Sequence, residues 1–243
     1  MSETIEGKNA VLEALKSGRP ILHIYLSKSL RPDEVIDEIK ELAKNRNIPF
    51  DFMERDILER GSTTKNSQGV IAQVGAQKYY ELHELLENPQ NDNPFLLILD
   101  EIEDPGNLGA ILRTADAAGV DGIIIPKRRS VGLNQTVAKT SAGAIEYVKV
   151  AQVTNINQAI SELKDQGIQI IGSAEDGHAK YTDIDLKGPI AIVIGSEGHG
   201  MRRLTKERCD QVVKIPMKGK ISSLNASVSA AIMMYEVVRQ RSS

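Results

Sequence analysis

Two spacings of apolar residues distinguish the elements in the first third of the chain. Apolar residues recur at helical spacing over residues 9–16 and 33–45, whereas residues 22–26 and 69–74 are short apolar runs typical of strands. Helical and strand patterns of this length in alternation indicate a compact unit that buries one shared core. The pattern therefore predicts a small α/β domain over residues 1–76.

The rest of the chain repeats one pattern, an apolar run followed by a helical segment. A parallel sheet covered by helices is built in this way, so we expect one over residues 95–243. Residues 77–94 contain many turn-forming asparagines and prolines, and we interpret them as a linker. The predicted strands lie near residues 95–100, 122–125, 147–150, 168–172, 190–194 and 211–215.

Residues 107–118 are predicted to form a helix whose apolar stripe packs on the sheet. Arg113 lies away from that stripe, on a face of unusually small side chains. A second, closely packed partner would explain the small face, whereas a solvent-exposed Arg113 paired with Asp116 is the simpler alternative. The stripe comprises Leu108, Ile111, Leu112 and Ala115, and the small face comprises Ala110, Thr114 and Ala117.

Composition narrows the possible classes of protein. No apolar run approaches the roughly 18 residues that span a bilayer, and the amino terminus is polar, so we expect a cytoplasmic protein without a membrane partner. Cys209 is the only cysteine, which excludes an internal disulfide and any CxxC metal site and favours a structural thiol. Neighbouring acids at residues 100–104 are interpreted as solvated, so no metal is expected.

Net charge gives no general argument for a nucleic-acid partner, because the formal charge is −3. A local cluster, Lys127-Arg128-Arg129, follows a predicted strand. This cluster is interpreted either as a solvated loop or as a contact to RNA phosphates.

Two glycine turns superficially resemble nucleotide motifs. Gly106 and Gly109 precede a helix, but the third glycine of a dinucleotide fingerprint is missing, which argues against NAD. Residues 172–180 contain the G-x-x-x-x-G of a P-loop without the lysine and hydroxyl residue that should follow it. We therefore reject the P-loop, and a nicotinamide-dependent enzyme stays as a disfavoured alternative that titration with NAD would test.

Two later segments carry more specific chemistry. Residues 195–201, Gly-Ser-Glu-Gly-His-Gly-Met, follow a buried strand, and their glycines allow a ligand to approach the backbone closely. Residues 215–229 lead into a last helix, for which the Ser222-Ser223 pair is the predicted cap. Its predicted apolar face comprises Leu224, Val228, Ala231, Ile232 and Tyr235.

Three stretches together resemble the three motifs of the SpoU (TrmH) family of ribose 2′-O-methyltransferases, within the SPOUT superfamily. The resemblance implies a carboxyl-terminal parallel-sheet α/β domain with a deep trefoil knot that binds S-adenosylmethionine, and a homodimer with sites near the subunit interface. It also implies an amino-terminal RNA-binding domain similar to a ribosomal protein. The stretches are Asn107-Leu108-Gly109-Ala110-Ile111-Leu112-Arg113-Thr114, Gly195-Ser196-Glu197-Gly198-His199-Gly200, and Ile215-Pro216-Met217 with Ser223-Leu224-Asn225-Ala226-Ser227.

The resemblance also implies a substrate. The family type most similar to this chain methylates a guanosine ribose of large-subunit (23S) rRNA, and tRNA is the main rival. An RNA-binding protein that has lost catalysis is a further alternative. It would retain the RNA-binding domain without binding S-adenosylmethionine.

Site residues follow from the same motifs, and no metal is required. Gly195, Ile215 and Leu224 would line the cofactor pocket, while Asn107, Glu197, Ser223 and Asn225 would shape the catalytic site through hydrogen bonds. In the family, the arginine at the position of Arg113 is the proposed general base. Because a guanidinium has a pKa above about 12, holding an RNA phosphate is the alternative role.

Overall fold

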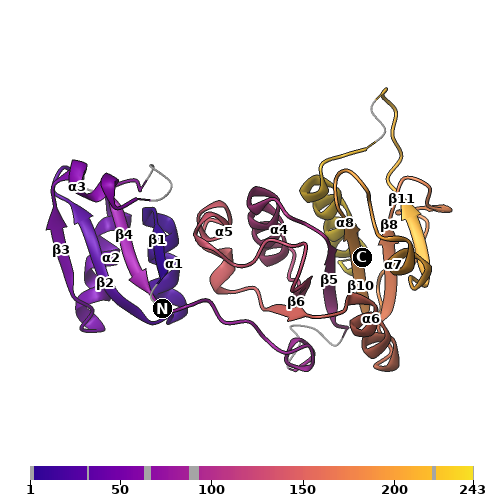
Figure 1. Ribbon diagram of the computed structural model, residues 1–243. Coiled ribbons are helices and arrows are strands. Elements are labelled where there is room, and N and C mark those ends of the chain that lie inside the picture. The colour runs from indigo at the N-terminus through magenta and orange to yellow at the C-terminus, as the bar shows by residue number, and fades with distance from the viewer. Residues whose placement is uncertain (1–2, 32, 63–66, 88–92, 221–222, 243) are drawn as a thin grey trace. The chain divides into compact units, whose positions relative to one another are not determined.

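The computed structural model describes residues 3–31, 33–62, 67–87, 93–220 and 223–242. The chain forms two compact units, each drawn in Figure 1. The first comprises Met1–Gln77 together with Leu133–Tyr147, and the second comprises Lys78–Gly132 together with Val148–Ser243. The sequence interpretation had assigned residues 133–147 to the carboxyl-terminal domain, whereas in the structure they pack with the first unit.

The first unit contains a four-stranded sheet in the order β1-β4-β2-β3. Strand β4 is antiparallel to both of its neighbours, and β2 and β3 are parallel. The predicted helices and strands are confirmed, while the short β1, β3 and α3 were not foreseen. The elements are β1 (Glu3–Glu6), α1 (Lys8–Ser17), β2 (Ile21–Ser27), α2 (Glu34–Asn45), β3 (Phe50–Met53), α3 (Arg55–Arg60) and β4 (Val70–Val74).

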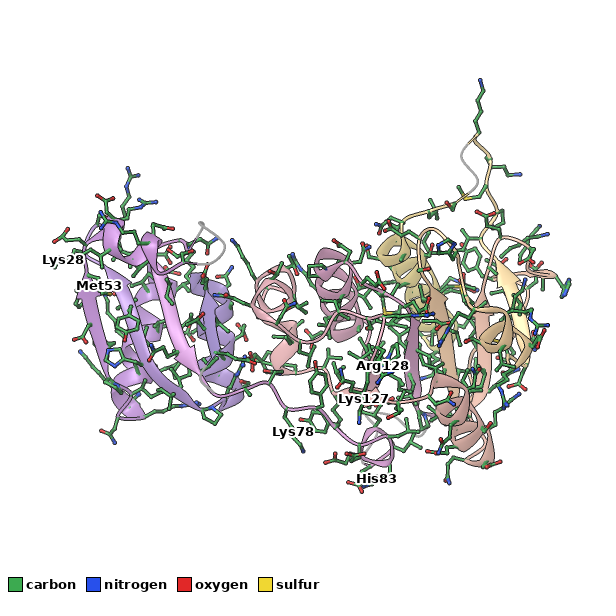
Figure 2. The ribbon with its side chains drawn as sticks, in the orientation of Figure 1. Lys28, Met53, Lys78, His83, Lys127 and Arg128 are labelled. Atoms are coloured by element: carbon green, nitrogen blue, oxygen red, sulfur yellow. The ribbon has the colours of Figure 1, made fainter. Side chains whose placement is uncertain are left out.

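Local signals explain where these elements begin and meet. The Asp33 carboxylate caps α2 by accepting a hydrogen bond of 2.9 Å from the Val35 amide. Figure 2 labels Lys28 and Met53 at one end of the sheet, where the Lys28 amide donates to the Met53 carbonyl at 2.9 Å. Helices α1 and α2 pack against each other, and Val11, Leu15 and Ile39 are fully buried.

The later segment of the first unit, residues 133–147, forms α5 (Gln135–Thr140) and η2 (Ala144–Glu146). The side-chain Nε2 of Gln135 donates to Glu6 Oε1 at 2.7 Å, which ties α5 to strand β1. Arg19 Nη1 lies 2.8 Å from Glu146 Oε1, and both side chains are almost completely buried. Polar bonds and an ion pair therefore hold this segment on the first unit.

The second unit contains a seven-stranded sheet in the order β7-β6-β5-β10-β8-β11-β9. Every neighbouring pair is parallel, which confirms the predicted sheet. Its elements are η1 (His83–Leu85), β5 (Phe95–Asp100), α4 (Pro105–Ala117), β6 (Gly122–Pro126), β7 (Val150–Val153), α6 (Ile156–Asp165), β8 (Gln169–Ser173), β9 (Ala179–Lys180), β10 (Ile190–Gly195), α7 (Arg203–Glu207), β11 (Gln211–Lys214) and α8 (Ala226–Arg241).

The core of this unit follows from the apolar runs. All six residues of β5 are buried, as expected for a central parallel strand covered on both faces. The predicted stripe of α4 is fully buried, and α4 packs beside α8 (Figure 1). Among the described residues, no helix has both the length and the apolar character needed to cross a membrane.

Three local predictions need correction. The third strand begins at Val150 and not at 147, because residues 144–146 form η2. Part of the predicted linker packs on the second unit, since Leu85 is buried and the Tyr80 amide donates to the Val150 carbonyl at 2.9 Å. Residues 88–92 of that linker lie outside the described residues.

The third correction concerns α8. Asn225 caps this helix by accepting bonds from the amides of Ser227 and Val228, so the Ser223 part of the predicted cap is wrong; Ser222 lies outside the described residues. The predicted apolar face is not the buried one, because Val228 is 45% and Tyr235 50% exposed. The buried face instead comprises Ala226, Ala230, Met233, Met234, Glu236, Val237 and Gln240.

Candidate active site

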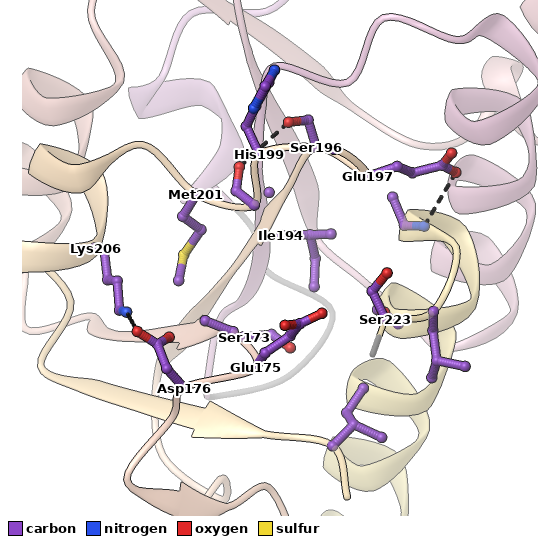
Figure 3. A pocket seen from close by; sticks show the side chains of 18 of the residues that line it. Ser173, Glu175, Asp176, Ile194, Ser196, Glu197, His199, Met201, Lys206 and Ser223 are labelled. Carbon is purple, nitrogen blue, oxygen red and sulfur yellow. Dashed lines mark hydrogen bonds and ion pairs between the residues drawn. The ribbon is translucent and has the colours of Figure 1, made fainter. Parts of the chain in front are cut away.

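A pocket of about 620 Å³ lies over the carboxyl ends of three adjacent parallel strands, β10, β8 and β11 (Figure 3). Such a position is typical of ligand sites in α/β sheets, because the loops that follow the strands meet there. Its lining residues are Ser173, Ala174, Glu175, Asp176, Ile194, Gly195, Ser196, Glu197, Gly198, His199, Gly200, Met201, Lys206, Ile215, Met217, Ser223, Leu224, Ala226 and Ser229.

The predicted cofactor residues all lie in this pocket. Gly195, Ile215 and Leu224 line it together with Glu197 and Ser223. These residues come from the end of β10, from the loop that follows it, and from the segment between β11 and α8. The structure therefore brings together the second and third of the sequence motifs.

Backbone geometry explains the glycines of the loop after β10. The Ser196 and Gly200 backbones pair through two hydrogen bonds of 3.1 and 2.9 Å, which fold the loop back on itself. A Cβ on Gly195 would lie 2.1 Å from the Gly200 carbonyl carbon, so a side chain cannot fit there. Gly200 also has a φ of 64°, in the region that glycine adopts readily.

A network of three side chains joins all three motifs beside the pocket. Asn107 Nδ2 donates to Glu197 Oε1 at 2.8 Å, and Asn225 Nδ2 donates both to Glu197 Oε1 and to Asn107 Oδ1, the latter at 2.9 Å. Glu197 comes from the loop after β10, whereas the two asparagines lie at the amino ends of α4 and α8. One carboxylate oxygen thus fixes the two helix starts to one loop.

The turn that presents Asn107 is itself capped. Asp104 Oδ1 accepts a hydrogen bond of 2.8 Å from the Asn107 amide at the start of α4. This cap leaves the Asn107 side chain available for Glu197. This turn therefore presents an asparagine side chain that forms hydrogen bonds with Glu197 and Asn225.

Arg113 lies apart from this network. It is exposed on α4 and does not line the pocket. Among the described residues it forms no ion pair, so the predicted alternative of an Arg113–Asp116 pair is wrong. Its guanidinium is therefore available to bind a ligand.

The predicted RNA-binding cluster divides into free and paired cations. Lys127 and Arg128 follow β6 directly and are exposed (Figure 2), and within the described ranges neither side chain forms an ion pair. Arg129 instead lies 3.3 Å from Glu101, and both residues have a positive φ. Arg129 is therefore held in the loop structure, whereas Lys127 and Arg128 remain available.

A buried acid fixes the neighbouring loops. Asp100, at the end of β5, is fully buried and accepts hydrogen bonds from Arg202 Nε at 2.8 Å and from the Arg202 amide at 2.9 Å. Arg202 is the N-cap residue of α7 and directly follows Met201, a residue of the pocket. The ion pair therefore connects the end of β5 to the end of the pocket loop.

Residues 173–176 and Lys206 line the pocket but were not predicted as site residues. The sequence had drawn attention to residues 172–180 only as a failed P-loop. Strand order could have found them, because β8 is the neighbour of β10, and Ser173 lies opposite Ile194. Their position thus depends on a pairing that a single sequence does not specify.

Two other expected properties concern Cys209 and metal binding. Burial raises the pKa of the Cys209 thiol to about 12, which agrees with a structural thiol. Over the described ranges of the chain, no three or more His, Cys, Asp or Glu side chains gather in a way that could hold a metal ion.

Comparisons with known proteins agree with the geometry. Residues 94–235 match the SpoU rRNA Methylase family, and residues 4–80 match the family described as RNA 2′-O ribose methyltransferase substrate binding. The chain belongs to the SpoU rRNA methylase family. This membership confirms the resemblance read from the three motifs, and with it the expected amino-terminal substrate-binding domain.

Individual relatives of this SpoU family member cover nearly all of it. A Bacillus subtilis (strain 168) protein named as a TrmH family tRNA/rRNA methyltransferase, YacO, is 48% identical over 97% of this chain and 94% of its own. The SpoU methyltransferase AviRb from Streptomyces viridochromogenes, solved with AdoMet (S-adenosylmethionine), has a TM-score of 0.83 at 25% identity and covers 100% of this chain and 91% of its own.

A second cofactor complex is equally informative. The AdoMet-bound rRNA methyltransferase from Sinorhizobium meliloti has a TM-score of 0.79 at 26% identity, covering 98% of this chain and 87% of its own. The present SpoU protein is accordingly an S-adenosylmethionine-dependent RNA methyltransferase with a SPOUT-type fold.

Proposed function

We propose that this protein methylates the 2′-hydroxyl of a ribose in RNA, and that its substrate is a guanosine of large-subunit (23S) rRNA. The observation that carries the proposal is the network of Asn107, Glu197 and Asn225, which joins the three motifs beside one pocket. The match of residues 4–80 to a 2′-O ribose methyltransferase substrate-binding domain supports the ribose as the target. Transfer RNA is the second candidate, because relatives are named as tRNA/rRNA methyltransferases.

The pocket suits S-adenosylmethionine in size and chemistry. Its volume of about 620 Å³ lies within the range of roughly 300–1,000 Å³ that is usual for small-molecule sites. Ile194, Met201, Ile215 and Leu224 supply apolar walls suited to adenine, and acidic groups suit a cationic ligand. The chemistry supplied by the bound cofactor is an electrophilic methyl group on a sulfonium.

The protein's own part in the reaction is to position the ribose hydroxyl for attack on the methyl group. Asn107, Glu197 and Asn225 act as a rigid unit, so their polar atoms need no reorganisation when RNA binds. Ser223 lines the pocket beside the start of α8 and provides a further hydroxyl for hydrogen bonding.

Arg113 binds the phosphate next to the target ribose in this proposal. It is exposed and unpaired among the described residues, as a phosphate ligand should be before RNA binds. Its guanidinium presents a fork of donors to phosphate oxygens, whereas a neutral arginine base would require the loss of a proton from a group with a pKa above about 12. Lys127 and Arg128 contact phosphates farther along the RNA.

The protein acts as a homodimer in this proposal, and its knotted topology remains a prediction from the family. Support for the dimer comes from the unburied apolar residues Val228 and Tyr235 of α8, together with exposed Ala117 on neighbouring α4. A bulky Ala117→Phe substitution should shift sedimentation from dimer to monomer. An unchanged dimer would contradict the use of this face.

The target is tested by mapping 2′-O-methyl groups in RNA from cells with and without the gene. A single guanosine of large-subunit rRNA should lose its methyl group in the deletion strain and regain it with the wild-type gene, but not with an Asn107→Ala gene. Loss from tRNA alone would favour the second candidate. An unchanged methylation pattern in both RNAs would contradict the proposal.

A further inference from the structure

Residues 172–180 fail as a P-loop, yet part of this segment is a wall of the pocket. Strand β8 ends at Ser173, and residues 173–176 line the cavity. The sheet order places β8 between β10 and β11, so this loop lies between the two loops that carry the later motifs. The segment is therefore placed to contact whatever the pocket binds.

The two acids of this loop have different surroundings. Asp176 forms an ion pair with Lys206, and this ammonium lowers the pKa of the Asp176 carboxyl from its ordinary value. Glu175 is exposed to the pocket, and its carboxylate forms no ion pair or side-chain hydrogen bond within the described part of the chain. Figure 3 shows Glu175 projecting into the pocket while Asp176 turns toward Lys206.

The third carboxylate among the lining residues, Glu197, is also engaged. Glu197 Oε1 accepts bonds from Asn107 and Asn225, and the Ala226 amide lies 3.4 Å from the same oxygen. Glu175 is thus the pocket carboxylate that retains its full capacity to accept hydrogen bonds from a ligand. A ligand with a cationic group, or with several neutral hydrogen-bond donors, would fill this capacity.

We propose that Glu175 binds the α-ammonium group of the methionine portion of S-adenosylmethionine. The inference rests on the proposed placement of the cofactor in this pocket. The amino-acid end of the cofactor carries an ammonium, and Glu175 is the carboxylate of this rim that pairs with no cation among the described residues, since Lys206 is paired with Asp176. An unpaired carboxylate matches this ammonium.

The ribose diol of the cofactor is the competing partner for Glu175. A diol can donate two hydrogen bonds to a carboxylate, but it carries no charge. An ammonium adds to its hydrogen bond a Coulombic attraction to the ionised carboxylate, which a neutral hydroxyl does not provide. The charge arrangement therefore favours the ammonium.

Calorimetric titration separates these partners without measuring catalysis. Wild type, Glu175→Gln and Glu175→Ala are titrated with S-adenosylmethionine, S-adenosylhomocysteine and methylthioadenosine, which retains the ribose but lacks the amino-acid end. Both variants should bind the first two ligands about tenfold more weakly, the loss expected for one charge-assisted hydrogen bond. Their affinity for methylthioadenosine should equal that of wild type.

The matched control is Glu162→Gln, an exposed acid on α6 that does not line the pocket and should leave every affinity unchanged. Thermal midpoints of all variants check folding. Unchanged S-adenosylmethionine affinity in both Glu175 variants would overturn the inference, and an equal loss for methylthioadenosine would assign Glu175 to the ribose instead. If wild type bound neither S-adenosylmethionine nor S-adenosylhomocysteine, the proposed placement of the cofactor in this pocket would be wrong.

Discussion

Two sets of charged and polar side chains in the second unit differ in what they bind. Asn107, Glu197 and Asn225 are bonded to one another, and Asp100 is bonded to Arg202. Arg113, Lys127 and Arg128 form no ion pairs within the described part of the chain. Side chains that are already paired hold their geometry before the substrate binds. Unpaired cations are instead available to bind an anion such as an RNA phosphate.

The largest expected effect comes from the unpaired Arg113. Arg113→Ala should lower methylation by about 1,000-fold, the upper loss seen when one electrostatic contact to a reacting centre is removed. The thermal midpoint should change little, because Arg113 is exposed and forms no side-chain hydrogen bond or ion pair among the described residues. Single-turnover assays at saturating cofactor measure the loss.

Arg113→Lys then separates the two roles of this residue. Retained methylation with weaker RNA binding would support the phosphate ligand, and normal RNA binding without methylation would support the general base. Arg203→Ala is the control, because the side chain of that arginine is 88% exposed and pairs with Glu207 on the surface.

The paired network should show a smaller catalytic effect. Glu197→Ala removes the acceptor shared by Asn107 and Asn225, so the starts of α4 and α8 lose their common anchor. A misplacement of about 1 Å in such a site costs about 100-fold in rate. Rate constants for wild type and variant test this, with Glu207→Ala as the control, and an unchanged rate would show that the network is not needed for positioning.

Arg202 should affect stability more than chemistry. Arg202→Ala leaves the fully buried Asp100 carboxylate without its partner. Breaking a fully buried pair costs about 3–5 kcal/mol, and the 41% exposure of Arg202 reduces the expected loss to about 2 kcal/mol. Urea denaturation measures this loss, and an added Asp100→Asn substitution should recover part of it.

The basic cluster offers a comparison within three consecutive residues. Lys127→Ala and Arg128→Ala should each weaken RNA binding a few-fold and reduce the slope of log affinity against log salt by about one. Arg129→Ala should leave that slope unchanged, because Arg129 is already paired with Glu101. Equal slopes for all three variants would remove the distinction between paired and unpaired cations.

The smallest effect concerns the buried pair of the first unit. Burial raises the pKa of the Glu146 carboxyl above its ordinary value, although Arg19 opposes the shift. Because the folded state then holds the proton more tightly than the unfolded state, protonation stabilises the fold. This contribution is complete below the ordinary pKa of about 4.5 and is lost as the pH rises through the raised folded value.

Glu146→Gln should therefore remove this pH dependence. The stability of wild type relative to the variant should fall as the pH rises above about 4.5, measured by urea midpoints. Glu3→Gln is the control, because Glu3 also pairs with Arg19 but is 42% exposed. A constant difference across pH would contradict the assignment.

The regular parts of the fold were accessible from the sequence because their signals are local. The apolar run of β5 and the stripe of α4 specify a strand and a buried helix face without reference to other elements. Strand β1 is only four residues long, and its pairing with β4 joins positions far apart in the chain. Such short elements depend on contacts that periodicity does not reveal.

The site was accessible in part for the same reason. Motif spacing located Asn107, Glu197 and Asn225, but their mutual bonds depend on β5 and β10 being neighbours. Glu175 was missed because its place in the pocket depends on the pairing of β8 with β10. The exposed side of α8 was misread because an apolar stripe shows that a face needs covering, and does not show what covers it.

Because residues 133–147 pack with the first unit, one cut in the sequence cannot separate the two units. A chain ending at residue 76 would lack the partner of the buried Arg19, and a chain starting at residue 95 would carry α5 and Glu146 without the strand and arginine that bind them. Neither half of the sequence is thus a self-sufficient piece. Exchange of the RNA-binding domain between relatives would have to carry both segments together, so this architecture resists recombination by simple end-to-end fusion.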